Sequence, residues 1–316
     1  MNTGSEKAAA MGCHIKDFDY ELPEDLIAQH PADRREASRL LVLDRHSGKT
    51  GHRRFGDLPL LLEPSDLLVV NDTRVVPVRL IGQKSTGGRA EVLLTDYAGG
   101  RTTGTGPYTF ECECLIRASR APGAGTELVF DSRLSGKVIS AAGQGRYTVE
   151  FISDMPIEKV LEETGRVPLP PYIKRSGPEA EKDDREKYQT VYAAKNGAAA
   201  APTAGFHFSR SLLDRIRKMG IQIAAVTLHV SYGTFMPVRV TDIRKHTMHT
   251  EHYEINQETA ELINRAKLEK RRVIAVGTTS VRTLEYSSDQ SGNIAPGRGA
   301  CDLFIYPGYK FKAVDA

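Results

Sequence analysis

The sequence predicts an α/β domain interrupted by an inserted all-β domain, which is a small antiparallel barrel. Between residues 74 and 153, short alternating apolar runs recur with glycine-rich links between them, and no helical pattern of ten residues interrupts them. Before and after that stretch, apolar strands alternate with amphipathic helical segments. The expected organisation is a flexible leader at 1–13, a discontinuous α/β domain at 14–73 and 154–316, and the barrel at 74–153.

The first section of the chain, residues 14–70, is expected to supply four strands and a helix, and to begin with one of these strands and a turn. Leu40–Asp44 is expected to be a short buried strand, the turn residues His46–Lys49 follow it, and a second strand should come next. A helix is expected to begin at Phe55. Leu67–Asn71 has the continuous apolar character of a buried strand.

Six runs have the alternation of barrel strands. They are 75–81, 90–94, 109–116, 127–130, 136–140 and 146–151. The α/β pattern then resumes, with helices expected at 155–165, 179–187, 209–220, 257–271 and 279–286, and strands at 221–230, 272–277 and 302–306. Ser209 is the expected N-cap of its helix. Val167–Ile173 holds three prolines and must run extended, because proline disfavours helical conformation at the residue before it.

Composition restricts the class of protein. The 316 residues contain 43 basic and 40 acidic side chains, a net charge of +3 that neither demands nor excludes a nucleic-acid partner. No apolar run approaches the about 20 residues of a membrane span, and the first residues lack the apolar core of a signal peptide. Cys112 and Cys114 would share one face of a strand, where buried thiols are favoured over a disulfide or a metal pair. We therefore expect a cytoplasmic protein.

Three hydroxyls crowd the turn between the strand at 272–277 and the next helix. Thr278, Thr279 and Ser280 cannot all cap that helix, so one is expected to cap it and the surplus to bind a ribose or carboxylate. The turn also follows a strand's carboxyl end, where ligands of α/β sheets usually bind. Arg282 and Glu285 lie three residues apart on the helix, so a surface ion pair is the simple alternative for Arg282.

Histidines supply candidates for proton transfer. His246, His249 and Glu251 fall within six residues, and acid–base work near neutral pH is favoured for them over metal binding, with plain surface histidines as the alternative. His207 projects from the tight segment 200–209 between two phenylalanines. It is a core histidine, an acid–base group or a neighbour that stacks on a base.

Two further segments could bind substrate. Asp72 and Arg74 follow a buried strand, where an Asx-turn is the ordinary alternative. Tyr172 and Arg175, with Lys174 between them, join a stiff proline-rich segment to an aromatic ring and two cations. That combination suits nucleic acid, although a solvated loop explains it equally well.

Seven motifs occur together in a fixed order. They are Asn71-Asp-Thr-Arg-Val, Pro168-Leu-Pro-Pro-Tyr-Ile, Tyr188-Gln-Thr-Val-Tyr-Ala, Ala201-Pro-Thr-Ala-Gly-Phe-His-Phe, Thr227-Leu-His-Val-Ser-Tyr-Gly-Thr-Phe, His246-Thr-Met-His-Thr-Glu and Gly277-Thr-Thr-Ser-Val-Arg-Thr-Leu-Glu. Through these seven motifs the chain strongly resembles the S-adenosylmethionine:tRNA ribosyltransferase-isomerase family of queuosine biosynthesis, and the resemblance extends from about Ile15 to Asp315. The family usually has glycine at Ser231 and leucine at Phe206, and its members usually continue beyond Asp315 with a further segment and a final helix.

The resemblance implies an α/β domain with a β-barrel insert, and a reaction. The ribosyl part of S-adenosylmethionine moves onto the aminomethyl group of a 7-deazaguanine at the wobble position of tRNA. The product is epoxyqueuosine-tRNA, and adenine and methionine are released. The implied partner is that tRNA, the implied co-substrate is S-adenosylmethionine, and we expect a monomer without a metal.

The reaction needs at least two proton transfers. A base must remove a proton from the ribose carbon beside the sulfonium, an acid must protonate the departing adenine, and the aminomethyl ammonium must lose a proton. We assign catalysis to His207, His246, His249 and Glu251, and substrate binding to Thr278, Thr279, Ser280, Arg282, Asp72, Arg74, Tyr172 and Arg175. The alternatives are an RNA-binding module without activity and an S-adenosylmethionine methyltransferase. The absence of a glycine-rich dinucleotide fingerprint speaks against the methyltransferase.

Overall fold

The computed structural model describes residues 13–103, 108–175 and 178–316, and for residues 178–182 it describes the backbone alone. The expected leader at 1–13 lies outside the described residues, apart from Cys13. Two compact units form. Among the described residues, the sheet unit comprises those of 13–72, 202–228 and 236–316, and the barrel unit comprises those of 73–201 and 229–235.

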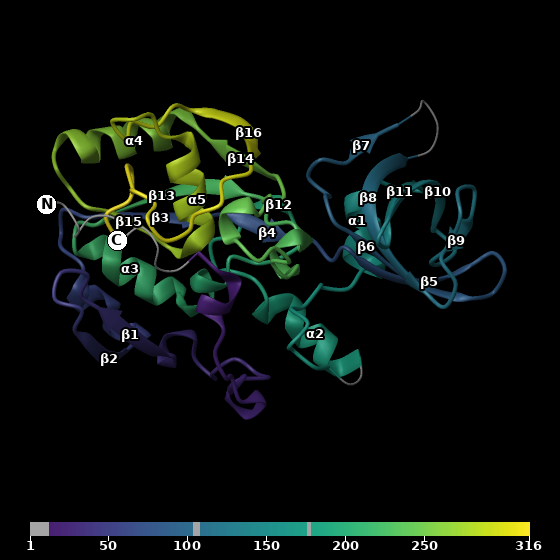
Figure 1. Cartoon of the computed structure of the whole chain (residues 1–316), viewed down its shortest axis with the longest axis horizontal. Coiled ribbons are helices and arrows are strands. Elements are labelled where there is room, and N and C mark those ends of the chain that lie inside the picture. Colours follow the sequence, from purple (N-terminus) through teal and green to yellow (C-terminus); the bar gives the residue numbers. More distant parts are fainter. Residues whose placement is uncertain (1–12, 104–107, 176–177) are drawn as a thin grey trace, which may run out of the picture. The chain divides into compact units, whose positions relative to one another are not determined.

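A mixed five-stranded sheet is the centre of the sheet unit (Figure 1). Its order is β15-β3-β13-β14-β16, with β15 (Val273–Ala275), β3 (Leu67–Asn71), β13 (Gln222–Leu228), β14 (Glu251–Ile255) and β16 (Gly297–Cys301). The β3 strand runs parallel to β15 and β13, whereas β14 is antiparallel to both of its neighbours. Strands and α-helices alternate along most of this unit, as the α/β prediction requires, although no α-helix separates β13 from β14.

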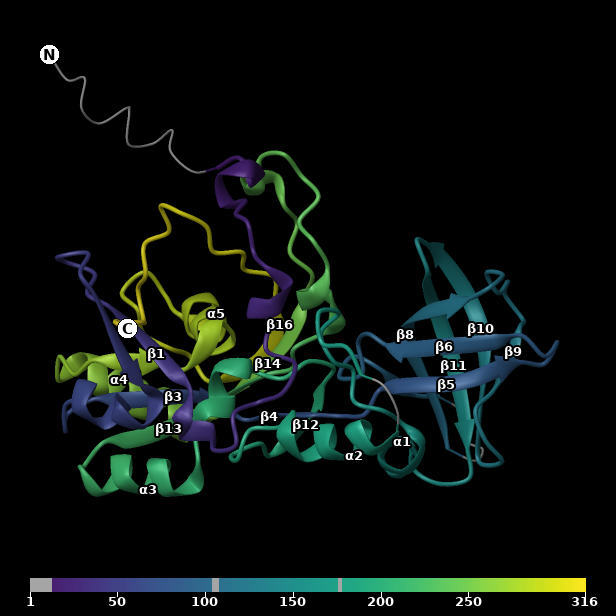
Figure 2. The ribbon, with the colours of Figure 1, turned by 90° about the horizontal axis from the view of Figure 1, so that it is seen from below.

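Helices cover both faces of this sheet. The helices are α3 (Arg210–Lys218), α4 (Gln257–Leu268) and α5 (Gly277–Ser287), and Figure 2 shows α3 on the opposite side of β3 and β13 from α5. All five residues of β3 are buried, as expected for a strand covered on both faces. Leu67 of β3 packs in one cluster with Ile263 of α4 and Leu284 of α5. Ser209 caps α3 as predicted, since its Oγ accepts the Leu212 N–H at 3.0 Å.

The remaining elements of the sheet unit are short. A hairpin joins β1 (Arg39–Leu43) to β2 (Thr50–Arg54), and the helix expected from Phe55 is a 3₁₀ helix, Phe55–Leu61. The prediction that the strand at Leu40–Asp44 is buried is wrong, because it belongs to a two-stranded sheet in which Leu41 and Leu43 are 60% and 61% exposed. Further 3₁₀ turns span Ile15–Phe18, Glu24–Leu26, Arg35–Ala37, Thr203–His207 and Ile243–Lys245. The helices and 3₁₀ turns described here include none long and apolar enough to cross a membrane.

The predicted antiparallel barrel is confirmed. Six strands close a ring in the order β11-β10-β9-β5-β6-β8, because β11 also pairs with β8, and β7 adds to β8. The strands are β5 (Arg79–Lys84), β6 (Arg89–Leu94), β7 (Arg101–Thr102), β8 (Thr109–Ala118), β9 (Glu127–Val129), β10 (Leu134–Gly143) and β11 (Arg146–Ser153). Cys112 and Cys114 are buried free thiols on β8.

Helix α1 (Ile157–Thr164) packs into the barrel core through Ile157, Val160 and Leu161. Gly165 ends it against the backbone of Pro77, where a Cβ would lie 1.8 Å from the carbonyl oxygen. The barrel unit also holds α2 (Pro178–Lys187), and β12 (Lys195–Ala198) paired with β4 (Thr73–Val75). This unit therefore continues through Ala201, beyond the end at residue 153 expected for the insert. The domain limits given from the sequence stay a prediction.

Two predicted strands are wrong. The strand expected at the start of residues 14–70 is instead the 3₁₀ turn Ile15–Phe18, which His14 caps. The apolar run 302–306 is not a strand, and the preceding Gly297–Cys301 forms β16 instead. The glycine-rich segment pairs residue for residue with β14, from Gly297 opposite Ile255 to Cys301 opposite Glu251. After that register ends, the carbonyl groups of Cys301 and Leu303 accept hydrogen bonds from Arg282 rather than from a neighbouring strand.

Candidate active site

Three of the predicted site residues form one connected group in the sheet unit. His249 Nε2 lies 3.0 Å from Glu251 Oε1, and Arg282 Nη1 donates to the other carboxylate oxygen, Oε2. Glu251 begins β14 and is 1% exposed, whereas the His249 side chain is 26% exposed. A carboxylate paired with a guanidinium can only accept, so this hydrogen bond places a proton on Nε2 of His249. An imidazole that a buried carboxylate orients in this way is suited to proton transfer.

Arg282 is placed by helix α5 and by two carbonyl groups. Its Nε donates to Leu303 O at 3.0 Å and its Nη2 to Cys301 O at 3.4 Å. The alternative of a surface pair with Glu285 is wrong, because both side chains are buried and have other partners. Glu285 instead accepts the backbone N–H groups of Lys312, Ala313 and Val314.

The hydroxyl turn lies at the start of α5. The expectation that one of its hydroxyls caps the helix is wrong, since α5 already begins at Gly277 and its N-cap, Val276, has no side-chain cap. Ser280 Oγ donates to Val276 O at 2.9 Å, while Thr278 is exposed. Thr279 Oγ1 is buried and has no hydrogen-bond partner in the part of the chain that the structure describes. This turn therefore holds one unused hydroxyl.

The turn packs against the loop that carries His207. Gly277 has φ +82°, and a Cβ there would lie 3.0 Å from the Cβ of Ala204 in the 3₁₀ turn Thr203–His207. His207 Nδ1 lies 3.0 Å from Ser38 Oγ, and its ring centroid is 5.1 Å from that of Phe55. These contacts are those of a half-buried packed histidine. The acid–base role assigned to His207 stays a prediction.

His207 should make the protein less stable at low pH. Burial lowers the pKa of His207, with the nearby positive charge of Arg35 as a second cause. The unfolded chain therefore binds the proton more readily, and stability falls as pH drops through the ordinary histidine pKa of about 6.5. In urea unfolding between about pH 7.5 and pH 5.5, His207→Gln should lose less stability than the wild type. An identical loss in both proteins would contradict this assignment.

His246 follows the 3₁₀ turn Ile243–Lys245, with its ring centroid 4.8 Å from that of Phe304. The residues between His246 and Glu251 are not helical, so the two imidazoles do not share a helix face as a helical metal site would require. Within 13–103, 108–175 and 178–316, no group of three or more His, Cys, Asp or Glu residues has an arrangement that could hold a metal ion.

The polar end of β3 is held by β13. Asn71 Oδ1 accepts the Leu228 N–H and Nδ2 donates to the Leu228 carbonyl, both at 3.0 Å. Thr227 Oγ1 donates to Asp72 Oδ1 at 2.6 Å. Asp72 is thus fixed beside the end of the sheet, and its substrate-binding role stays a prediction.

Three predicted substrate-binding residues belong to the barrel unit. Arg74 is exposed on β4, and Tyr172 is 53% exposed. Arg175 is different, because its side chain is only 15% exposed and forms a double hydrogen bond with the buried Asp184. Its positive charge is therefore already compensated within the protein, which weakens the expectation that it contacts a phosphate.

Sequence reasoning passed over His229, which lies in the motif Thr227–Phe235. Its Nδ1 is 2.8 Å from Thr73 Oγ1, and a Cβ at Gly197 would lie 2.3 Å from the same atom. The His229 ring therefore packs directly against the backbone of residue 197, where any side chain larger than that of glycine would collide with it. The sequence held one indication of His229, namely its position inside the motif Thr227–Phe235.

A chain with a closed barrel and, in its α/β unit, an imidazole hydrogen-bonded to a buried carboxylate has the groups that enzymes use for acid–base chemistry. The chain belongs to the queuosine biosynthesis protein family, which matches residues 15–316.

Several curated relatives are named S-adenosylmethionine:tRNA ribosyltransferase-isomerase. The relative from Syntrophotalea carbinolica is 49% identical over 95% of this chain and 85% of its own, and the one from Citrifermentans bemidjiense is 50% identical over 96% and 85%. A solved structure, S-adenosylmethionine tRNA ribosyltransferase from Thermotoga maritima, is 31% identical, covering 94% of this chain and 82% of that one, with a TM-score of 0.45.

Proposed function

We propose that this protein is an S-adenosylmethionine:tRNA ribosyltransferase-isomerase. The observation that carries the proposal is the 44–50% identity to enzymes of that name over at least 95% of the chain. The enzyme transfers and isomerises the ribosyl group of S-adenosylmethionine onto the aminomethyl group of a 7-deazaguanine at the tRNA wobble position. Epoxyqueuosine-tRNA forms, and adenine and methionine leave.

The connected group of His249, Glu251 and Arg282 supports one of the proton transfers. The reaction removes a proton from the ribose carbon beside the sulfonium, and Nδ1 of His249 is the proposed base, since imidazoles commonly act as general bases. Glu251 positions the imidazole through its Nε2–H and stabilises the imidazolium that forms, while Arg282 fixes Glu251. His207 and His246 are the candidates for protonating adenine and for accepting the ammonium proton.

The hydroxyl turn is the proposed place of S-adenosylmethionine. Backbone N–H groups at a helix N-terminus favour ligand oxygens, and Thr279 adds a buried hydroxyl without a partner among the described residues. Thr278 and Arg282 belong to the same helix. Ser280, by contrast, already donates a hydrogen bond from its hydroxyl to the Val276 carbonyl.

Thr279→Val should weaken S-adenosylmethionine binding about 2–13-fold, the worth of one neutral hydrogen bond. Folding should be unchanged or slightly improved, because valine keeps the shape and removes an unpaired buried hydroxyl. Calorimetry measures the affinity, and the exposed neighbour Thr278→Val is the matched control. Normal S-adenosylmethionine affinity with poor tRNA binding would assign the turn to RNA instead.

Binding of tRNA should depend on a local basic patch, since the net charge is only +3. Arg74, Tyr172 and Lys174 are exposed members of the barrel unit that could contribute to it. We expect a monomeric enzyme that works without a metal.

Identifying the released products tests the function. With S-adenosylmethionine and tRNA carrying the aminomethyl-deazaguanine, the protein should release adenine and methionine. Release of S-adenosylhomocysteine would identify a methyltransferase, and binding of tRNA without any product would identify an RNA-binding module.

A further inference from the structure

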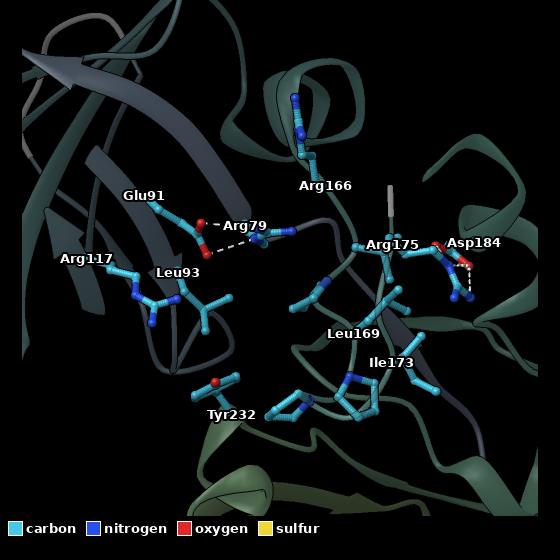
Figure 3. Close-up of a pocket in the computed structure, with 14 residues that line it drawn as sticks. Arg79, Glu91, Leu93, Arg117, Arg166, Leu169, Ile173, Arg175, Asp184 and Tyr232 are labelled. Atoms are coloured by element: carbon cyan, nitrogen blue, oxygen red, sulfur yellow. Dashed lines mark hydrogen bonds and ion pairs between the residues drawn. The ribbon is translucent and has the colours of Figure 1, made fainter. Parts of the chain in front are cut away.

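A cavity of about 680 Å³ lies within the barrel unit (Figure 3). One side is formed by strands β5 and β6, which contribute Arg79, Glu91 and Leu93. The proline-rich segment 166–173 forms another, and Tyr232 comes from the short segment 229–235. The volume lies in the range of small-molecule sites, about 300–1,000 Å³. No residue of this cavity belongs to the His249 group.

Positive charge predominates in the lining. Arg79 donates to both oxygens of Glu91, at 2.9 and 3.1 Å. Arg175 likewise forms a bidentate pair with Asp184. Each carboxylate of the lining is thus matched by one guanidinium. Arg117 adds a further cation, and its side chain is exposed. It lies opposite Glu91 in the register of β6 and β8. An anionic ligand is therefore favoured.

The cavity also offers flat apolar surface beside these cations. The Tyr232 ring packs against the barrel core and lies edge-on to Phe235, with 5.4 Å between ring centroids. Pro168 and Pro170 are buried, so the facing wall is stiff. In Figure 3, Arg117 lies next to Leu93, on the side of the cavity where Tyr232 lies. A cation next to an aromatic ring is the pairing with which proteins bind a phosphate and its base.

We propose that this cavity holds one unpaired nucleotide of the tRNA, with its phosphate at Arg117 and its base against Tyr232. The inference rests on the proposed function and names a contact of its RNA substrate. S-adenosylmethionine fits less well, because its sulfonium and ammonium outweigh its single carboxylate and would meet a net positive lining. A cavity of this volume admits one base but not a duplex.

Affinity for a tRNA transcript, measured by fluorescence anisotropy at several salt concentrations, tests the proposal. Arg117→Ala should weaken binding about 5–10-fold and lower the slope of log affinity against log salt by about 0.7–0.9, the loss of one phosphate contact. Tyr232→Ala should weaken binding about 5–100-fold with little change of slope, as expected for a lost stacking contact. Affinity for S-adenosylmethionine should stay at the wild-type value in both variants.

Arg120→Ala is the matched control, since Arg120 is an exposed arginine of the same unit outside the cavity lining. Arg117→Lys keeps the charge and should retain the salt slope. The proposal is overturned if Arg117→Ala and Tyr232→Ala bind tRNA as the wild type does, if Arg120→Ala loses as much as Arg117→Ala, or if S-adenosylmethionine affinity falls instead. A wild-type protein that binds tRNA but releases no adenine would refute the proposed function and leave this contact measurable.

Discussion

Replacing His249 with alanine should lower the rate of adenine release by about 10²–10⁴, the usual contribution of a positioned acid–base group. The reason is the geometry of the ring, which donates through Nε2 to the buried Glu251 and presents Nδ1 as a base. The melting temperature should stay near that of the wild type, because the side chain is partly exposed. Single-turnover kinetics at saturating S-adenosylmethionine and tRNA measure the effect.

His252→Ala is the matched control for this experiment. His252 lies on the same strand, β14, and has no catalytic role in the proposal. It should release adenine at close to the wild-type rate. Equal losses in both variants, or a His249→Ala enzyme with an unchanged rate, would remove His249 from the mechanism. Loss of activity on adding a chelator, with recovery on adding zinc, would favour the metal alternative instead.

Glu251→Leu should destabilise the protein by about 3–5 kcal/mol, the cost of leaving a buried charge without its partner. The Glu251 side chain is 0% exposed and the Arg282 side chain 11%, so solvent can compensate little of the lost interaction. Urea unfolding measures the change. The double variant Glu251→Leu with Arg282→Met removes both charges and should recover much of the lost stability.

A third measurement separates the stability role of this pair from the catalytic one. Because Glu251 orients His249, the double variant should fold but release adenine slowly. Glu251→Leu with wild-type stability would show that the pair contributes little to the fold. A double variant with full activity would show that His249 needs no orienting carboxylate.

Local patterns made the barrel predictable. Alternating apolar residues and glycine-rich links are properties of neighbouring residues, and the strand runs given from the sequence overlap β5, β6, β8, β9, β10 and β11. Ser209 was likewise identifiable as a cap, because a capping side chain acts within three residues.

Features that depend on pairing between residues distant in the sequence could not be predicted from local patterns. The segment 297–301 has weak strand propensity and became a strand only because it pairs with β14, while the apolar run after it did not. Arg282 and Glu251 are 31 residues apart, and no local rule joins them. The same limit applies to Arg175, whose charge was visible in the sequence but whose compensation by Asp184 was not.

The central claim is that the ribosyl group of S-adenosylmethionine ends on the tRNA through chemistry that depends on His249. S-adenosylmethionine labelled with carbon-13 in its ribose should be incubated with the wild-type protein and tRNA carrying the aminomethyl-deazaguanine, and the tRNA nucleosides examined by mass spectrometry. We expect the label in a nucleoside heavier by the ribosyl group in the wild type, and almost none in His249→Ala. Label that stays in solution with wild-type protein, or that reaches the tRNA equally well with His249→Ala, would contradict the account.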